Sequence, residues 1–65
     1  MMISKGMTVP TIKSKMKRLH WWKLHDEIDF KNNRHRNLIY HTGKDILCFW
    51  FEDGKLKEWM RTEED

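Results

Sequence analysis

The four histidines and the single cysteine are the residues whose types could bind a metal ion. Metal sites usually show paired ligands at tight spacings, because two ligands on one turn or hairpin fix half of the coordination sphere. Here the gaps between successive candidates are five, ten, six and seven residues; the candidates are His20, His25, His35, His41 and Cys48. We therefore expect scattered surface histidines, a small apolar cysteine on a strand, and no metal or cofactor.

Two carboxylates, Glu27 and Asp29, would share one strand face and could form an acid and base pair. Such a pair needs a cleft that shifts its pKa values, and a chain of 65 residues without long loops rarely forms one. Ser14 and Cys48 belong to no nucleophile motif, and the three glycines stand singly rather than in a phosphate-binding loop. We expect a solvated strand face and no enzyme.

The basic residues of the first half of the chain point to binding of an anionic partner rather than to catalysis. Residues 1–44 carry ten Lys and Arg against three Asp and Glu, whereas residues 45–65 carry three against seven. This asymmetry can steer an anionic partner to one face, or the two halves can complement each other. Beside the adjacent Trp21 and Trp22, the cations combine attraction to phosphate with stacking surfaces, as in sequence-tolerant nucleic-acid binding. The residues expected to carry that function are Lys13, Lys17, Arg18, Arg34 and Arg36.

A solvated polar face is the other interpretation of the lysines, because Lys13 and Lys15 would point about 200° apart on a helix. The four tryptophans favour a protein partner. Tryptophan is enriched at interface hot spots, so Trp21, Trp50 and Trp59 are the expected anchors. Which tryptophans belong to the core is not apparent from the sequence.

The elements that would position these residues begin with a helix. Thr8 is a plausible N-cap, and Pro10 falls in the first turn, where its missing N–H is not needed. Apolar residues then recur at spacings of three and four, which places them on one helix face: Val9, Ile12, Met16 and Leu19. The pattern predicts a helix from Pro10 to Leu19 or His20, after a leader of residues 1–7.

Strands follow the helix. Apolar and polar residues alternate from Trp22 to Phe30, with Asp26 the polar exception on the apolar face, which indicates a bulge or an edge position. After a polar loop over 31–36, further strands are expected at 37–41, 46–51 and 55–61, the last two joined by an Asp53-Gly54 turn. Residues 62–65 read as a frayed acidic tail. The sequence predicts one α+β domain over residues 1–65, with an N-terminal helix packed on a three- to four-stranded antiparallel meander sheet.

Strand 46–51 is apolar on both alternating sets of positions. A strand of this kind is normally central in its sheet, or covered on its second face. One helix covers only one face of a sheet, so the other would form a surface for a partner or for a homodimer. Loops or the leader could cover that face instead.

The residues Ile3-Ser-Lys-Gly-Met-Thr8, with Ile12 and Met16, resemble the opening of the BamE (SmpA/OmlA) outer-membrane assembly lipoprotein family, and Phe51-Glu-Asp-Gly-Lys-Leu56 resembles its later hairpin. The family's Gly-x-Pro after the first helix is replaced by Lys17-Arg18-Leu19, and neither its second helix nor its lipobox is present. The resemblance implies a helix-on-meander fold used for protein binding, without the outer-membrane role.

The leading hypothesis is a small cytoplasmic adaptor or inhibitor that docks an aromatic sheet face onto another protein, with no membrane association. Its brevity and its richness in Met and Trp resemble accessory proteins encoded by bacteriophages and mobile elements. Nucleic-acid binding through the basic half is the alternative, and a homodimer could accompany either function.

Overall fold

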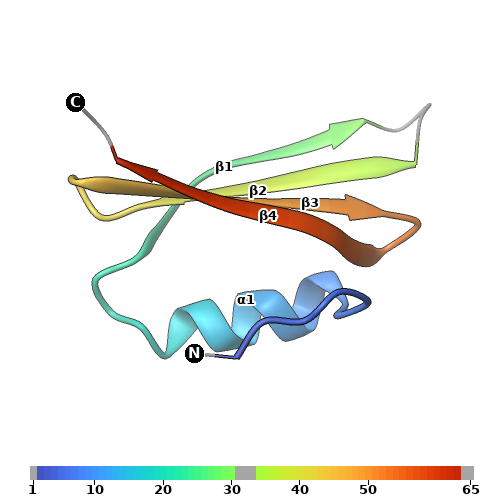
Figure 1. Ribbon diagram of the computed structural model, residues 1–65, viewed down its shortest axis with the longest axis horizontal. Coiled ribbons are helices and arrows are strands. Elements are labelled where there is room, and N and C mark those ends of the chain that lie inside the picture. Colours follow the sequence, from blue (N-terminus) through green and yellow to red (C-terminus); the bar gives the residue numbers. More distant parts are fainter. Residues whose placement is uncertain (1, 31–33, 64–65) are drawn as a thin grey trace.

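The computed structural model describes residues 2–30 and 34–63, which form one helix followed by four strands (Figure 1). The helix is α1 (Val9–Lys17), and the strands are β1 (Lys23–Phe30), β2 (His35–His41), β3 (Asp45–Glu52) and β4 (Lys55–Glu63). The strands make one antiparallel sheet in the order β1-β2-β3-β4, and α1 lies under one of its faces (Figure 1). The predicted α+β class, with an N-terminal helix on an antiparallel meander, is confirmed.

Helix α1 begins as its sequence predicts. Thr8 has an extended backbone, and its hydroxyl accepts a hydrogen bond from the Thr11 N–H at 3.4 Å. The helix ends at Lys17, two to three residues earlier than predicted, because the next amides bond three residues back rather than four. The Arg18 N–H donates to the Lys15 carbonyl at 3.2 Å, and the Leu19 N–H donates to the Met16 carbonyl at 3.0 Å. Such tightened turns are common where helices end.

The hairpin between β3 and β4 has the predicted two-residue turn. Asp53 and Gly54 both have positive φ, 51° and 80°, as a type I′ turn requires. The strands on either side are longer than expected, and β4 continues to Glu63. The assignment of Thr62 and Glu63 to a frayed tail was wrong, because they pair with Ile46 and Asp45; residues 64–65 lie outside the described residues.

Strand β2 also begins earlier than predicted, at His35, because His35 pairs with Phe30 of β1 and with Glu52 of β3. His35 and Arg36 were assigned to the polar loop of residues 31–36, and for these two that was wrong. Residues 31–33 of that loop lie outside the described residues.

The irregularity expected at Asp26 is present, and it changes the interpretation of β1. The register of β1 on β2 shifts between Leu24 and Asp26. Leu24 pairs with the core residue Tyr40, whereas beyond the shift Ile28 pairs with Asn37, on the opposite face. The single apolar face predicted for residues 22–30 was therefore wrong, because one extra residue in a strand reverses the alternation.

The core lies between α1 and the sheet. Its largest fully buried side chains are Ile12 and Met16 from the helix and Leu38, Phe49 and Phe51 from the two central strands. The leader packs beside them: the Gly6 N–H donates to the Leu56 carbonyl, and the Leu56 N–H donates to the Met7 carbonyl, both at 2.7 Å. Part of the outer edge of β4 is thereby paired by the leader.

Candidate functional site

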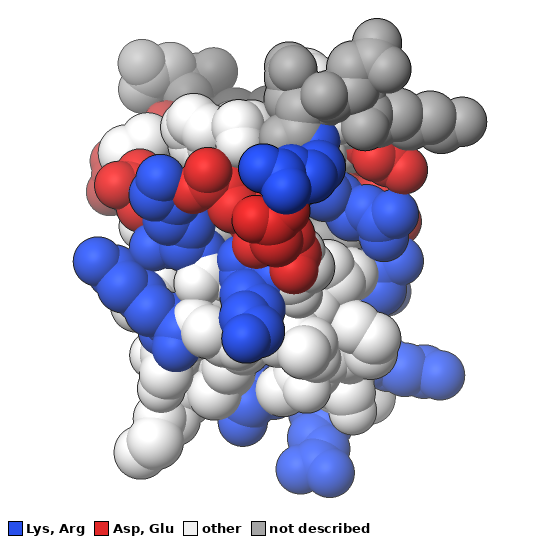
Figure 2. Space-filling view, turned by 90° about the vertical axis from the view of Figure 1, so that its right-hand side faces the viewer, with Lys and Arg blue, Asp and Glu red and all other residues white. Residues whose placement is uncertain are grey.

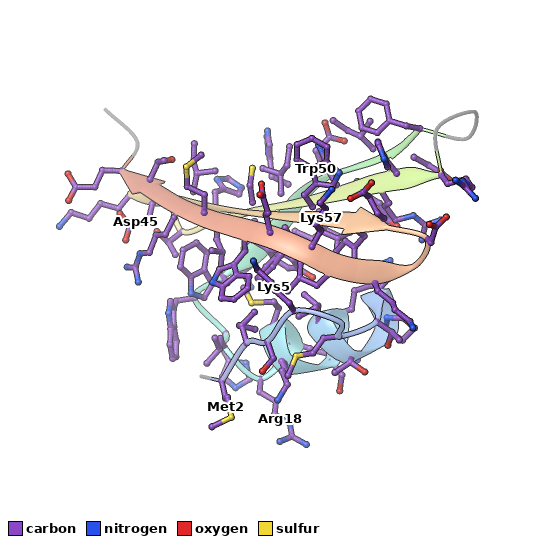
Figure 3. The ribbon with its side chains drawn as sticks, turned by 45° about the vertical axis from the view of Figure 1, so that its right-hand side comes forward. Met2, Lys5, Arg18, Asp45, Trp50 and Lys57 are labelled. Carbon is purple, nitrogen blue, oxygen red and sulfur yellow. The ribbon has the colours of Figure 1, made fainter. Side chains whose placement is uncertain are left out.

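The two apolar sets of β3 have different surroundings. Leu47, Phe49 and Phe51 are buried toward α1, whereas Cys48 and Trp50 belong to the opposite face of the sheet. Figure 3 shows Trp50 standing on the side of the sheet away from the helix. Strand β3 is central, as predicted, with β2 and β4 as neighbours. Its second apolar set is therefore available to form a surface.

Strand pairing identifies the rest of this surface, because directly paired residues project from the same face of a sheet. Trp50 pairs with Asn37 and Glu58, and Cys48 pairs with Ile39 and Met60. We call the surface the open face. Its centre consists of Ile28, Asn37, Ile39, Ile46, Cys48, Trp50 and Met60, and its rim of His25, Asp26, Phe30, His35, His41, Glu52, Lys57, Glu58 and Thr62.

None of the described helices or loops lies over the open face (Figure 1). Trp50 is 43% exposed and Met60 is 63% exposed, and the three isoleucines of the centre are half-buried only by their neighbours in the sheet. Large apolar side chains grouped in this way on a small protein usually mark an interaction surface.

Asn37 is the one polar side chain in the centre of the open face. Its Oδ1 is buried and has no hydrogen-bond partner in the structure. Neighbouring side chains shield this oxygen from water, and none of the described groups donates to it. An unpaired buried acceptor costs about 1–3 kcal/mol. A molecule that covers the open face and brings a donor to this point would remove that cost.

The rim carries charges of both signs. At one end, Nε2 of His35 lies 3.1 Å from Oε1 of Glu52, and the Lys57 ammonium pairs with the same carboxylate. The hydrogen bond from Lys57 lowers the pKa of Glu52 below its ordinary value and raises the pKa of Lys57. At the other end, the rings of His25 and His41 meet edge to face, with centroids 4.7 Å apart.

The three predicted tryptophan anchors are all exposed, but they do not share one face. Trp50 lies on the open face, whereas Trp59 pairs with Phe49, so it projects from the helix side of β4 and is 41% exposed. Trp21 is 61% exposed in the turn after α1, and Trp22, only 7% exposed, is the tryptophan of the core.

A shallow hollow of about 630 Å³ runs along β4 and connects two of these tryptophans. Trp50 and Met60 line it from the open face, and Trp59 and Lys5 line it from the other side of the strand. A partner that wraps around the free part of the β4 edge would contact Trp50 and Trp59 together. Trp21 does not line this hollow.

Sequence reasoning missed Asn37, Ile39 and Met60 as members of the surface. Ile39 carried a weak signal, since it stands between two core residues, Leu38 and Tyr40, and so had to face the other way. Asn37 and Met60 carried none, because their places depend on the long-range register of β2 and β4 on β3.

Some of the basic residues predicted to bind nucleic acid form ion pairs with carboxylates, and others do not. Lys13 pairs with Glu27 at 2.8 Å, and Arg36 lies between Glu27 at 3.3 Å and Asp29 at 3.2 Å. Arg34 is 3.3 Å from an oxygen of Asp53. Lys17 and Arg18 take part in no ion pair with the residues that the structure describes. Of these ion pairs only Arg34–Asp53 joins residues 1–44 to residues 45–65, so the complementarity between the two halves, considered for the asymmetric charge, holds for Arg34 alone in this set.

Within residues 2–30 and 34–63, no three or more His, Cys, Asp or Glu side chains gather in a group that could hold a metal ion. No described helix has the length and apolar composition needed to cross a membrane.

Models of protein families, curated proteins and solved structures were all searched with this chain, and none of them matched. The resemblance to the BamE family stays a prediction.

Proposed function

We propose that this protein is a small cytoplasmic adaptor or inhibitor without enzymatic activity, which binds another protein through its open face. The observation that carries the proposal is the composition of that face. It has an apolar centre around Ile39, Cys48, Trp50 and Met60 and a polar rim of both signs. Protein interfaces have the same anatomy, with few charges at the centre and polar residues around it.

The shape and chemistry of the open face indicate which kind of partner surface would fit it. A complementary surface would be broadly flat and apolar, because the centre is formed by side chains of adjacent sheet strands. It would carry a hydrogen-bond donor opposite Asn37, whose Oδ1 is buried and unpaired. A neighbouring ridge could enter the hollow along β4, between Trp50 and Trp59.

The test compares two exposed tryptophans that lie on different surfaces. A tagged protein is used to isolate partners from the native host with and without nuclease, and each purified candidate is then titrated with wild type, Trp50→Ala and Trp21→Ala. Trp50→Ala should weaken binding by about tenfold or more, as expected for a hot-spot tryptophan, while Trp21→Ala should leave it unchanged. Circular dichroism of both variants should match wild type.

The proposal would be overturned if Trp50→Ala and a second open-face variant, Met60→Ala, both bound the partner as tightly as wild type does. Light scattering measures the mass of the free protein. A dimer would show that a second copy of the chain can occupy the open face. In that case the same two variants should shift the protein from dimer to monomer.

A further inference from the structure

The segment that lies on the other side of the sheet from the open face (Figure 1) carries basic residues and no acidic ones. Residues 2–22, comprising the leader, α1 and the turn after it, contain five Lys and Arg and no Asp or Glu. We call this segment the basic layer; its cations are Lys5, Lys13, Lys15, Lys17 and Arg18. On the face that Figure 2 shows, the lower part, which is the helix side, carries basic side chains and no acidic ones, and the acidic side chains lie in the upper part.

Ion pairs compensate four cations of the sheet side but only one of the basic layer. Arg34, Arg36, Lys57 and Arg61 of the sheet side each lie against a carboxylate. In the basic layer only Lys13 has such a partner among the residues that the structure describes. Lys5, Lys15, Lys17 and Arg18 are therefore left as uncompensated positive charge, which attracts polyanions to this side.

An exposed aromatic ring accompanies these cations. Trp21 follows Arg18 by three residues, and a hydrogen bond of 3.0 Å from the Trp22 N–H to the Leu19 carbonyl closes the turn that holds it. Its ring is 61% exposed. Proteins that bind single strands combine positive charge along the backbone with aromatic rings on which unpaired bases stack.

A lipid surface fits the basic layer less well. Helices that bind membranes lie in the interface with their apolar face inserted among the acyl chains. The apolar face of α1, formed by Val9, Ile12 and Met16, is already buried against the sheet. Its outward positions include Thr11 and Ser14, which have no affinity for hydrocarbon.

We propose that the basic layer binds single-stranded nucleic acid, with phosphates at Lys5, Lys15, Lys17 and Arg18 and a base stacked on Trp21. Lys15 and Lys17 are about 200° apart around the helix axis, with Arg18 between them on the outward side, so the strand would cross α1 rather than follow its axis. This set replaces Lys13, Arg34 and Arg36, whose charges are engaged in ion pairs. Arg18 and Trp50 project from opposite sides of the molecule in Figure 3. Protein binding at the centre of the open face and nucleic-acid binding at Arg18 are thus compatible, and the protein would link its partner to a nucleic acid. Of the four phosphate contacts, Lys5 is the one that also lines the hollow along β4.

The experiment is a titration of the full chain with fluorescently labelled single-stranded DNA and single-stranded RNA over a series of salt concentrations. Four phosphate contacts predict a slope of log K against log salt of about −2.8, from about −0.7 for each contact to a single strand. Lys17→Gln/Arg18→Gln should make this slope shallower by about 1.4. Lys44→Gln/Lys57→Gln, which removes the same charge from the sheet side, should leave the slope unchanged.

Trp21→Ala should reduce the affinity by about tenfold or more without changing the slope, because stacking releases no counterions. Trp50→Ala should bind as wild type does, which separates this proposal from the one for the open face. Thermal melts of each variant exclude loss of the fold.

Three results would overturn the proposal: no binding to either single strand at low salt, equal effects of the two double variants, or tighter binding to a competitor. The competitors are duplex DNA, polyglutamate and vesicles of phosphatidylcholine with phosphatidylglycerol. They represent a duplex, an acidic protein and a membrane. None of these results affects the titrations of the protein partner with Trp50→Ala.

Discussion

Asn37→Leu is the most informative single substitution, because it separates the stability of the free protein from its binding. Leucine has the same branched shape as asparagine but no polar atoms. Replacing a buried unpaired polar group by an apolar one of the same shape is neutral to stabilising, since it removes a cost of about 1–3 kcal/mol. Asn37 lies between Ile28 and Trp50, which provide apolar neighbours for the new side chain.

We therefore expect Asn37→Leu to raise the free energy of unfolding by about 1 kcal/mol and the Tm by about 4–8 °C, the shift per kcal/mol for a domain of this size. The complex with the protein partner should become weaker at the same time, by about tenfold or more, because the donor that the partner brings loses its acceptor. Stability is measured by urea and thermal unfolding followed by circular dichroism, and affinity by titration calorimetry.

Thr62→Val on the rim of the same face is the matched control. Thr62 is exposed, so its substitution should change the stability by no more than about 0.5 kcal/mol. A loss of 1 kcal/mol or more in the free Asn37→Leu protein would refute the reasoning, since it would show that the amide is satisfied before any partner binds.

Three further predictions concern the fold. Phe49→Ala deletes a fully buried ring and should cost about 3–5 kcal/mol, so that circular dichroism at room temperature shows a largely unfolded chain; a cooperative melt near the wild-type Tm would contradict this. Gly54→Ala should lose about 1–2 kcal/mol in urea unfolding through backbone strain alone, because Gly54 has a φ of +80° and no atom lies within 4 Å of the added Cβ; Gly54→Asn should recover part of the loss. Because the folded pKa of Glu52 is lowered, its ion pair with Lys57 stabilises the protein at neutral pH and is lost as the pH falls through that folded pKa. Glu52→Gln should therefore show a smaller loss of stability than wild type between about pH 6 and about pH 3, and parallel pH profiles would count against the pair.

Features that depend on neighbouring residues were predictable. The N-cap at Thr8 and the turn at Asp53 and Gly54 follow from residue types within a few positions, and both are present. The central place of β3 followed from its two apolar sets. The full length of β4 was not predictable, since it depends on pairing with β3. The end of α1 was placed too late because Leu19 continues the apolar spacing of the helix and packs against the core from the tightened turn that follows it.

The candidate site was only partly predictable, for a similar reason. Trp50 was chosen for its residue type, and strand pairing places it on the open face beside Asn37. Trp21 and Trp59 were chosen for the same reason, yet they project elsewhere. Residue type identifies a side chain suited to an interface, whereas the surface it joins depends on register and on the bulge in β1.

The sequence by itself determined the local conformations and the unequal distribution of charge, because propensities, turn chemistry and composition act over short distances along the chain. It presented protein binding and nucleic-acid binding as rival functions of one small domain. Only the tertiary structure decided which apolar set of β3 is buried under α1, which cations are paired, and on which sides the rest are exposed. A single helix covers one face of a sheet and leaves the other open, so two different surfaces exist on opposite sides of 65 residues.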